Sequence, residues 1–335
     1  MMNEKKRNEK GAPVSRRIGA KIGAGAMAVA IAVSIAALPA NALAAGNAER
    51  QVAAYSASGV DYGPLNEYLK GLEERQLTVH SIKNKNVWSY QRKAVSIAGR
   101  QLSVNSLTIN GKEYIPSRKA AEALGLSYNY NSAAKSVTIK GAGLEMTFSN
   151  GSYVTWANGR ALFSMSPSVI MSDGRMYIPA ESFAKAVGLR FSSTSQAVLL
   201  SGSYAPIVSG DKFYRSDEVF WLARIIQAES AGEPLLGQIA VGNIVLNRVK
   251  SSAYPNTIYG VIFDRKYGVQ FSPVLDGSIY NTPGYSATLA AKICLDGYDV
   301  SDGTLFFLRP EHSTSSWIPK NRQYGFTIGD HDFYY

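Results

Sequence analysis

An internal repeat is the feature of this sequence that most restricts its fold. A segment between residues 93 and 204 recurs 63 residues further along the chain. Three landmarks keep that spacing in both copies: a turn dipeptide, a Tyr-Ile-Pro tripeptide and a glycine. They lie at 110–111 and 173–174, at 114–116 and 177–179, and at 125 and 188. A constant offset over three landmarks predicts that both copies form the same structural unit.

Each landmark is typical of a particular backbone structure. Asn-Gly and Asp-Gly supply the positive φ angles of a tight hairpin turn, and a proline at a strand end can begin a helix. The glycine that follows the short helix is typical of a left-handed C-cap. A strand at 136–139 or at 197–200 then completes each copy. The repeat therefore predicts two units, each consisting of a β-hairpin, a helix and a strand.

On these residues, the region 93–204 resembles the copper amine oxidase N-terminal-like domain, a small α+β stalk module of exported proteins. Copper itself is not implied, because the region contains no histidine and no cysteine, the imidazole and soft ligands that copper prefers. We expect a spacer, or a module through which the protein attaches to the cell wall.

The first residues have the order of an export signal. Seven Lys and Arg residues in 1–44 lead into an uncharged stretch at 22–38, and Ala42-Leu43-Ala44 follows. This order predicts a signal peptide at 1–45 that is cleaved. The alternative is an uncleaved anchor, but 17 residues rich in Ala and Gly are short for about 30 Å of hydrocarbon. We therefore expect a secreted protein without a lasting membrane span.

Charge and composition exclude several classes of partner. Without residues 1–44, the chain has 28 basic and 23 acidic residues, a net charge of +5. That charge suits loose attraction to an anionic cell wall, and no nucleic-acid-binding motif is present. Residues 46–92 are expected to be a linker, with one short amphipathic helix around 65–72.

Cysteine and histidine usage excludes further chemistries. Cys294 is the only cysteine, so neither an intrachain disulfide nor a thiolate zinc cluster can form. It lies in an apolar stretch, 287–295, that predicts a buried helix and an inert thiol. His312 and His331 lack the spacing of a zinc hydrolase. The sequence therefore indicates no metal and no cofactor, and it disfavours a zinc amidase and a cysteine peptidase.

One glutamate has the setting that acid catalysis requires. Ser-Asp-Glu at 216–218 predicts the start of a helix through capping and first-turn negative charge. Apolar residues at 219, 222 and 226 then lead to Glu229 at spacings of three, four and three. Glu229 therefore shares the buried face of that helix, unless it is a surface residue at the helix end. Burial raises a carboxyl pKa, as a general acid near neutral pH requires.

The sequence around Glu229 resembles the spore cortex-lytic and cell wall hydrolase family (SleB/CwlJ type). The resemblance rests on Ala-Glu-Ser-Ala-Gly-Glu-Pro at 228–234 and on further segments in the same order. These segments are 237–241, 245–250, 254–262, 270–272, 296–297, 305–307, 317–318 and 328–331. It implies a lysozyme-like α+β domain over 214–335 that acts on peptidoglycan. Glu229 then matches the catalytic glutamate, and Glu233 matches a second glutamate that we interpret as structural.

The resemblance further implies a lytic transglycosylase, in which Glu229 protonates the MurNAc-GlcNAc glycosidic oxygen and then deprotonates the muramic 6-hydroxyl. A hydrolase would instead need a second carboxylate. The candidates for it are Asp264, Asp276, Asp296, Asp299, Asp302 and Asp330. The expected substrate contacts are Gln270, Ser272, Tyr280, Tyr285 and Trp317. The alternative for Trp317 and the two tyrosines is a place in the core or at its rim.

Spore cortex, in germination or sporulation, and vegetative wall are both candidate substrates, and we expect a cell wall or spore location. The alternative to an enzyme is a wall-binding or spore-coat scaffold without catalysis.

Overall fold

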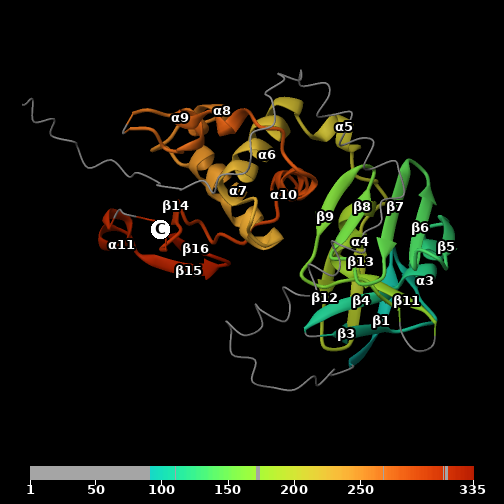
Figure 1. Ribbon diagram of the computed structural model, residues 1–335. Helices are drawn as coiled ribbons and strands as arrows, with labels where there is room; N and C mark the ends of the chain where they lie inside the picture. The colour runs from blue at the N-terminus through green and yellow to red at the C-terminus, as the bar shows by residue number, and fades with distance from the viewer. Residues whose placement is uncertain (1–90, 110, 171–173, 267, 312, 314–315) are drawn as a thin grey trace, which may run out of the picture.

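The computed structural model describes residues 91–109, 111–170, 174–266, 268–311, 313 and 316–335. The predicted signal peptide and nearly all of the predicted linker lie outside these residues. The chain is an α+β protein, with a β-rich N-terminal domain (91–204) beside a mainly helical C-terminal domain (210–335) (Figure 1). Within the described residues, no helix is both long enough and apolar enough to cross a membrane.

The N-terminal domain contains two sheets and two short helices. Its strands are β1 (Gln91–Ile97), β2 (Arg100–Gln101), β3 (Ser106–Ile109), β4 (Lys112–Pro116), β5 (Ser127–Asn131), β6 (Ser136–Gly141), β7 (Leu144–Ser149), β8 (Val154–Ala157), β9 (Arg160–Phe163), β10 (Val169–Ile170), β11 (Met176–Pro179), β12 (Arg190–Ser193) and β13 (Ala197–Ser201). Its helices are α3 (Ser117–Ala123) and α4 (Ala180–Val187). One sheet has the order β10-β11-β4-β3-β1-β13-β12, with β2 on β1, and the other has the order β5-β6-β7-β8-β9.

The two copies of the repeat fold alike, and each has one strand more than predicted. In both, the strand that ends in proline (β4 or β11) leads directly into the helix (α3 or α4). Gly125 and Gly188 follow the helices with φ of 68° and 72°, as expected of left-handed caps. The additional strands, β5 and β12, are polar and largely exposed at sheet edges, so they lack the apolar alternation that sequence reading depends on.

The C-terminal domain is built around three helices that pack against one another, α6, α7 and α10 (Figure 1). Its elements are α5 (Gly210–Phe213), α6 (Ser216–Ser230), α7 (Leu235–Lys250), α8 (Ile258–Ile262), α9 (Pro273–Asp276), η1 (Ser278–Tyr280), α10 (Tyr285–Leu295), β14 (Phe306–Leu308), α11 (Trp317–Asn321), β15 (Tyr324–Ile328) and β16 (His331–Tyr334). Strands β14, β16 and β15 form a small antiparallel sheet, with β16 in the middle. Helix α7 contacts α8 on one side, and β14 and β15 on another.

The predicted capping of α6 is wrong in detail. Ser216 is the first residue of the helix, and the N-cap position is Arg215, which makes no side-chain capping hydrogen bond. The acidic first turn is present, because Asp217 and Glu218 both lie in it. Negative charge near the positive end of the helix dipole therefore accompanies this helix start instead of a capping hydroxyl.

Gly242 of α7 lies close to side chains of both α6 and α10. A Cβ atom built there would lie 2.7 Å from the Sγ atom of Cys294 and 2.8 Å from the Cδ1 atom of Ile226. The thiol of Cys294 is buried and donates to the carbonyl of Ile239, which agrees with the predicted structural role of this cysteine. Glycine is required here because two neighbouring helices leave no room for a methyl group.

We expect Gly242→Ala to lower the free energy of unfolding by about 2 kcal/mol, because overpacking a tight core forces neighbouring side chains and backbone to move. Higher helix propensity returns at most about 1 kcal/mol of that loss. Urea unfolding measures the change. The matched control is Gly232→Ala, where the new methyl group would meet no atom within 4 Å. Equal stability of the two variants would contradict this account of the packing.

The two domains share one hydrophobic core. Tyr153, Val154 and Ala161 of the N-terminal domain belong to the same buried cluster as the apolar residues of α6, α7 and α10. The ring of Phe163, at the end of β9, lies edge-on to the ring of Tyr298, with centroids 4.6 Å apart. The N-terminal domain is therefore packed against the back of α10 and is not merely tethered to it.

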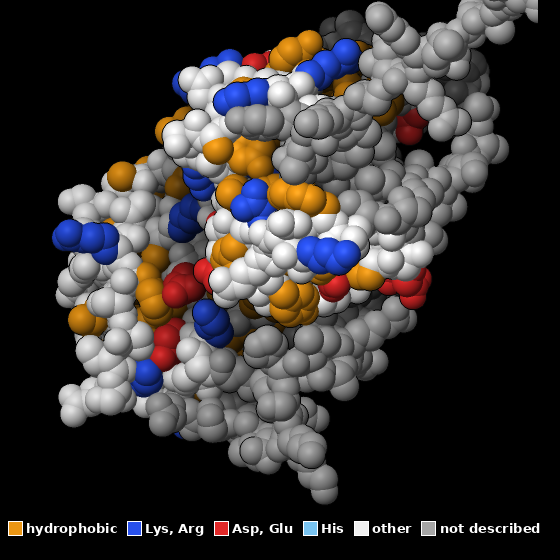
Figure 2. All heavy atoms as spheres, turned by 90° about the vertical axis from the view of Figure 1, so that its left-hand side faces the viewer, with side chains coloured by type: hydrophobic (Ala, Val, Ile, Leu, Met, Phe, Trp, Pro, Cys, Tyr) orange, Lys and Arg blue, Asp and Glu red, His pale blue; other side chains and the backbone are white. Residues whose placement is uncertain are grey.

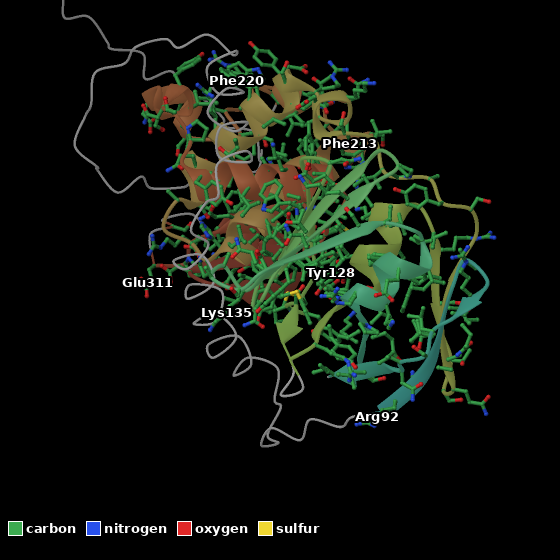
Figure 3. The ribbon with its side chains drawn as sticks, turned by 90° about the vertical axis from the view of Figure 1, so that its right-hand side faces the viewer. Arg92, Tyr128, Lys135, Phe213, Phe220 and Glu311 are labelled. Carbon is green, nitrogen blue, oxygen red and sulfur yellow. The ribbon has the colours of Figure 1, made fainter. Side chains whose placement is uncertain are left out.

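A buried ion pair accompanies this apolar contact. Asp296, the residue after α10, accepts hydrogen bonds from Nε and Nη2 of Arg160, at 2.9 and 2.5 Å. The hydroxyl of Tyr214 also donates to this carboxylate, and the Nζ atom of Lys185 donates to the carbonyl of Asp296 at 2.7 Å. The guanidinium of Arg160 in turn covers the ring of Phe213, which Figure 3 shows near the junction of the domains. One carboxylate thus links elements that are distant in sequence.

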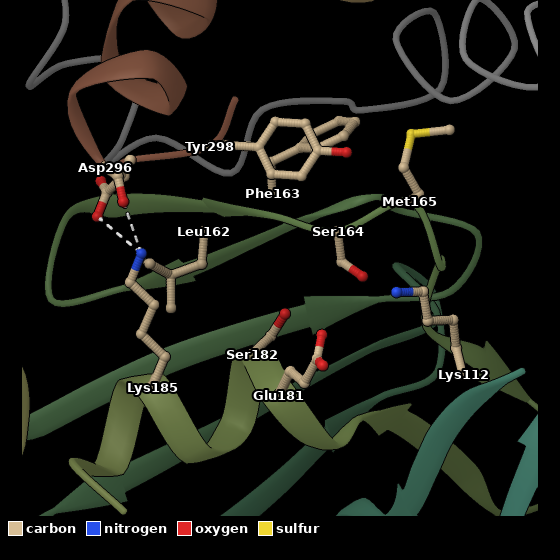
Figure 4. Close-up of a pocket in the computed structure, with 11 residues that line it drawn as sticks. Lys112, Leu162, Phe163, Ser164, Met165, Glu181, Ser182, Lys185, Asp296 and Tyr298 are labelled. Carbon is tan, nitrogen blue, oxygen red and sulfur yellow. Dashed lines mark hydrogen bonds and ion pairs between the residues drawn. The ribbon is translucent and has the colours of Figure 1, made fainter. Parts of the chain in front are cut away.

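A cavity of about 230 Å³ opens beside this ion pair, between the two domains. Figure 4 shows Lys185 directed at Asp296 on one side of it, while Lys112, Glu181 and Ser164 line the other side. The cavity lies at the interface of the domains, and Glu229 does not line it.

Candidate active site

Glu229 lies one residue before the end of α6, on the buried face of that helix. Leu222, Ile226 and Glu229 are all buried, as their spacing predicts. Glu229 is 7% exposed, and neither of its carboxyl oxygens has a hydrogen-bond partner among the described residues. Burial raises the pKa of Glu229 to about 8. The side chain therefore holds a proton near neutral pH, which is the state that a general acid needs.

Two charged groups act on Glu229 from different elements. The guanidinium of Arg248, in the last turn of α7, favours the ionised carboxylate and lowers the pKa. Asp276, at the end of α9, acts in the opposite direction, because two like charges disfavour ionisation. Burial is the largest of the three influences, so the carboxyl group stays protonated despite the nearby cation.

Glu233, which we interpreted as structural, contacts the turn between β15 and β16. Its Oε2 atom accepts a hydrogen bond from the backbone N–H of Asp330 at 3.0 Å, and its Oε1 atom lies 3.4 Å from Nδ1 of His331. Burial favours the neutral form of this carboxyl, but the interactions with His331 and with the N–H of Asp330 outweigh it and lower the pKa. A Cβ atom at Gly329 would lie 1.9 Å from Oε2, so glycine is required there. Glu233 therefore joins the start of α7 to the β15–β16 turn.

The predicted substrate contacts fall into two groups. Gln270 and Ser272 flank the buried ring of Phe271, which lies 5.2 Å from the guanidinium carbon of Arg248. Gln270 and Ser272 are thus the chain neighbours of Phe271, whose ring lies near Arg248, the cation that acts on Glu229. Gln270 is itself buried, and its Nε2 atom donates to the carbonyl of Gly268 at 3.1 Å.

The second group consists of aromatic residues. Tyr280 is 62% exposed, and its ring lies edge-on to that of Trp221, with centroids 6.3 Å apart. The ring centroid of Trp317 lies 6.5 Å from that of Phe306. Trp317 packs against a small hydrophobic cluster formed by Phe306, Leu308, Ile318 and Tyr334. Tyr285 begins α10 and is half-buried. Figure 2 shows the face that carries α8, α9 and the small sheet, where hydrophobic, basic and acidic side chains are interspersed.

Four of the six candidate aspartates interact with other side chains. Asp296 belongs to the domain interface, Asp299 accepts hydrogen bonds from Ser301, Asp302 accepts one from Tyr335, and Asp330 pairs with Arg309. Asp276 is the one aspartate among the described residues that acts on the pKa of Glu229. Within those residues, no cluster of three or more His, Cys, Asp and Glu side chains could hold a metal ion.

Arg248 is the member of this site that the sequence analysis missed, whereas Asp276 was one of its six candidate aspartates. For Arg248 the signal was present, because residues 241, 244, 245 and 248 have the spacing of one buried helix face. That is the pattern by which Glu229 was recognised. No pattern distinguished Asp276 from the other five aspartates, since it lies in a four-residue helix on an exposed turn.

Comparison with known proteins identifies both domains. The sequence matches the Cell Wall Hydrolase family over residues 232–334, and the Copper amine oxidase N-terminal domain family over residues 96–199. The first match begins three residues after Glu229. The C-terminal domain thus belongs to the cell wall hydrolase family, and a copper amine oxidase N-terminal domain precedes it.

The particular relatives are spore cortex-lytic enzymes. That of Bacillus cereus is 39% identical over 120 residues, which are 36% of this chain and 45% of the relative. That of Bacillus subtilis is 35% identical over 105 residues, which are 31% of this chain and 33% of the relative. The chain therefore spans less than half the length of either relative. A solved structure, the catalytic domain of the germination-specific lytic transglycosylase SleB from Bacillus anthracis, has 37% sequence identity and a TM-score of 0.34, and the match covers 38% of this chain and all of that one.

Proposed function

We propose that the C-terminal domain cleaves the glycan strands of peptidoglycan as a lytic transglycosylase, with Glu229 as its acid and base. The observation that carries the proposal is a buried glutamate that stays protonated near pH 7. Membership of the cell wall hydrolase family and the similarity to spore cortex-lytic enzymes support the choice of substrate. Glu229 would give its proton to the oxygen between N-acetylmuramic acid and N-acetylglucosamine as that bond breaks. It would then take the proton of the muramic 6-hydroxyl as the 1,6-anhydro ring closes.

The neighbouring side chains would hold the sugar. Tyr280 offers an exposed ring face on which a pyranose could stack, and Trp317 offers a half-buried indole ring. Gln270 and Ser272 supply amide and hydroxyl groups in the segment that leads into α9. We propose these four residues as substrate contacts, with no metal and no cofactor in the reaction.

Digestion of peptidoglycan by the full chain, followed by mass spectrometry of the products, tests the proposal. We expect 1,6-anhydromuramic ends, and both spore cortex and vegetative wall should be digested side by side. Reducing muramic acid ends instead would show a hydrolase, for which Asp276 is the candidate second carboxylate. Binding to either wall without cleavage would show the scaffold protein that is the alternative to an enzyme.

We expect activity to fall as the pH rises through about 8, the pKa of Glu229, because an ionised carboxylate cannot donate a proton. Asp276→Asn should move this alkaline limb to lower pH by up to about one unit, since it removes the like charge that raises the pKa. A pH–rate profile of kcat/KM measures both. If Asp276 were a nucleophile, the variant would instead lose activity at every pH.

We further propose that the chain is exported through a cleaved signal at residues 1–45 and acts at the cell wall or the spore. The order of charged, apolar and small residues in this segment supports export. The N-terminal domain would hold the enzyme at the wall. Sequencing the N-terminus of the secreted protein tests the cleavage, and pull-down of the Glu229→Gln chain with insoluble peptidoglycan tests attachment.

A further inference from the structure

Arg248 is the largest fully buried side chain of the described residues, and it joins two parts of the C-terminal domain. Its Nε atom donates to the carbonyl of Leu305, just before β14, at 2.8 Å. Its guanidinium carbon lies 5.1 Å and 5.2 Å from the ring centroids of Tyr254 and Phe271, and 5.7 Å from that of Phe306. Phe306 lies in the small sheet, whereas Tyr254 and Phe271 flank the segment that carries α8. The guanidinium is therefore fixed in position from both sides.

Asn247, the residue before Arg248, holds the chain segment that leads into β14. The Nδ2 atom of Asn247 donates to the hydroxyl of Ser301 at 2.8 Å and to the carbonyl of Thr304 at 3.1 Å. The last turn of α7 thus anchors the chain that enters β14 through a neutral amide as well as through Arg248. A structural anchor at this place does not require a charge, so the charge of Arg248 calls for another explanation.

Arg248 and Glu229 both carry buried polar atoms without a hydrogen-bond partner among the described residues. These atoms are Nη1 of Arg248 and both carboxyl oxygens of Glu229. A buried cation with an unused donor is costly in a folded protein. Such a cost is understandable where a negative charge forms transiently beside the cation. The two groups lie near enough to interact by charge.

We propose that Arg248 is a positioning residue that supplies a fixed counter-charge to Glu229 between the two proton transfers. The inference rests on the proposed function. As the glycosidic bond breaks, its electron pair goes to the leaving oxygen, which takes the proton of Glu229. The carboxylate that remains is buried and negative until it takes the 6-hydroxyl proton, while a lone pair of that oxygen forms the bond to C1. Arg248 stabilises the carboxylate during this interval without touching the sugar.

The other charges near this pair are few and can be separated from it. Asp276 acts on Glu229 from α9, and Tyr254 and Asp264 act on Arg248 from the segment around α8. Asp276 is exposed at its helix end and opposes ionisation of Glu229, whereas Arg248 favours it. Removing Arg248 should therefore move the ionisation of Glu229 in the direction opposite to that expected for Asp276→Asn.

The test compares Arg248→Gln, Arg248→Met and Arg248→Lys in the full chain. The glutamine amide can still donate to the carbonyl of Leu305 but carries no charge, and the lysine keeps the charge but loses the planar fork. Titration of the Glu229 carboxyl carbon by carbon-13 NMR, with Glu229→Gln to identify the signal, gives the pKa without substrate. A pH–rate profile on peptidoglycan gives kcat and KM. Arg265→Gln, an exposed arginine in the loop after α8, is the control.

We expect both neutral variants to raise the Glu229 titration and the alkaline limb by about one pH unit, a tenfold change in proton affinity. Their kcat should fall at least tenfold while KM stays within about twofold. Arg248→Lys should titrate within about 0.3 units of the wild type, and this variant alone decides the question if the neutral variants do not fold. Unmoved titration in a folded neutral variant, or a rise of a full unit in Arg248→Lys, would overturn the proposal. A chain that cleaves no peptidoglycan but shows the expected NMR shift would refute the proposed function and leave the charge pairing intact.

Discussion

Glu229→Gln is expected to lower the rate of peptidoglycan cleavage by about 10²–10⁴-fold, the range that a positioned general acid contributes. Glutamine has nearly the size and shape of a protonated glutamic acid, so the variant should fold and bind glycan strands as the wild type does. It cannot release a proton to the leaving oxygen, nor take one from the 6-hydroxyl. Release of soluble fragments from purified peptidoglycan, followed over time, measures the loss.

A matched control lies on the same helix. Glu218 is in the first turn of α6, where its side chain is 38% exposed, and Glu218→Gln should keep the activity of the wild type. Wild-type activity in Glu229→Gln would remove Glu229 from the mechanism. Equal losses in both variants would point to a change in helix α6 and not to loss of the acid.

The same substitution has a consequence for stability that needs no substrate. Between its ordinary pKa of 4.5 and about 8, Glu229 holds a proton in the folded chain that the unfolded chain has released. The free energy of unfolding of the wild type therefore falls as the pH rises through this window. Glu229→Gln has no proton to lose. Thermal unfolding should thus show the variant gaining stability over the wild type from pH 5 to pH 8, in contrast to Glu218→Gln.

The buried parts of this fold were predictable where an apolar pattern marks them. Helix α6 and its buried glutamate follow from spacings of three and four residues, and both repeat helices follow from a proline before and a glycine after them. Strands β5 and β12 were missed because they are polar edge strands, whose partners are set by the other strands of the sheet. The residues of β5 and β12 themselves do not indicate which strands they pair with.

The site was predictable to the same extent. The burial of Glu229 followed from its place on a helix face, and its catalytic role was predicted from the resemblance to the cell wall hydrolase family. Arg248 has the same kind of place on α7. What no local pattern could give is that these two faces meet, because their contact depends on the packing of α6 against α7. The burial of Asp296 was likewise hidden, since its partner Arg160 lies 136 residues away.

Asp296→Asn is expected to lower the free energy of unfolding by about 3 kcal/mol, because it leaves the guanidinium of Arg160 buried without its counter-charge. Arg160 and Asp296 are 7% and 7% exposed, so water cannot take over the lost interaction. The loss falls on a contact that the two domains share, since Arg160 lies in β9 and Asp296 follows α10. Differential scanning calorimetry should show the melting temperature of the full chain falling by about 6–12 °C.

The comparison with an exposed pair isolates the effect of burial. Lys140 and Glu145 lie 2.9 Å apart with side chains 54% and 62% exposed, so Glu145→Gln should change the stability by less than about 0.5 kcal/mol.

A second variant separates the effect of charge from the effect of packing. Arg160→Met with Asp296→Leu replaces the ion pair by apolar groups of similar size and should lose less stability than Asp296→Asn alone, because no charge remains buried and unpaired. If Asp296→Asn instead melted like the wild type, the two domains would not depend on this ion pair. The N-terminal domain would then be held in place by its other contacts, which include the burial of Tyr153, Val154 and Ala161 in the shared core.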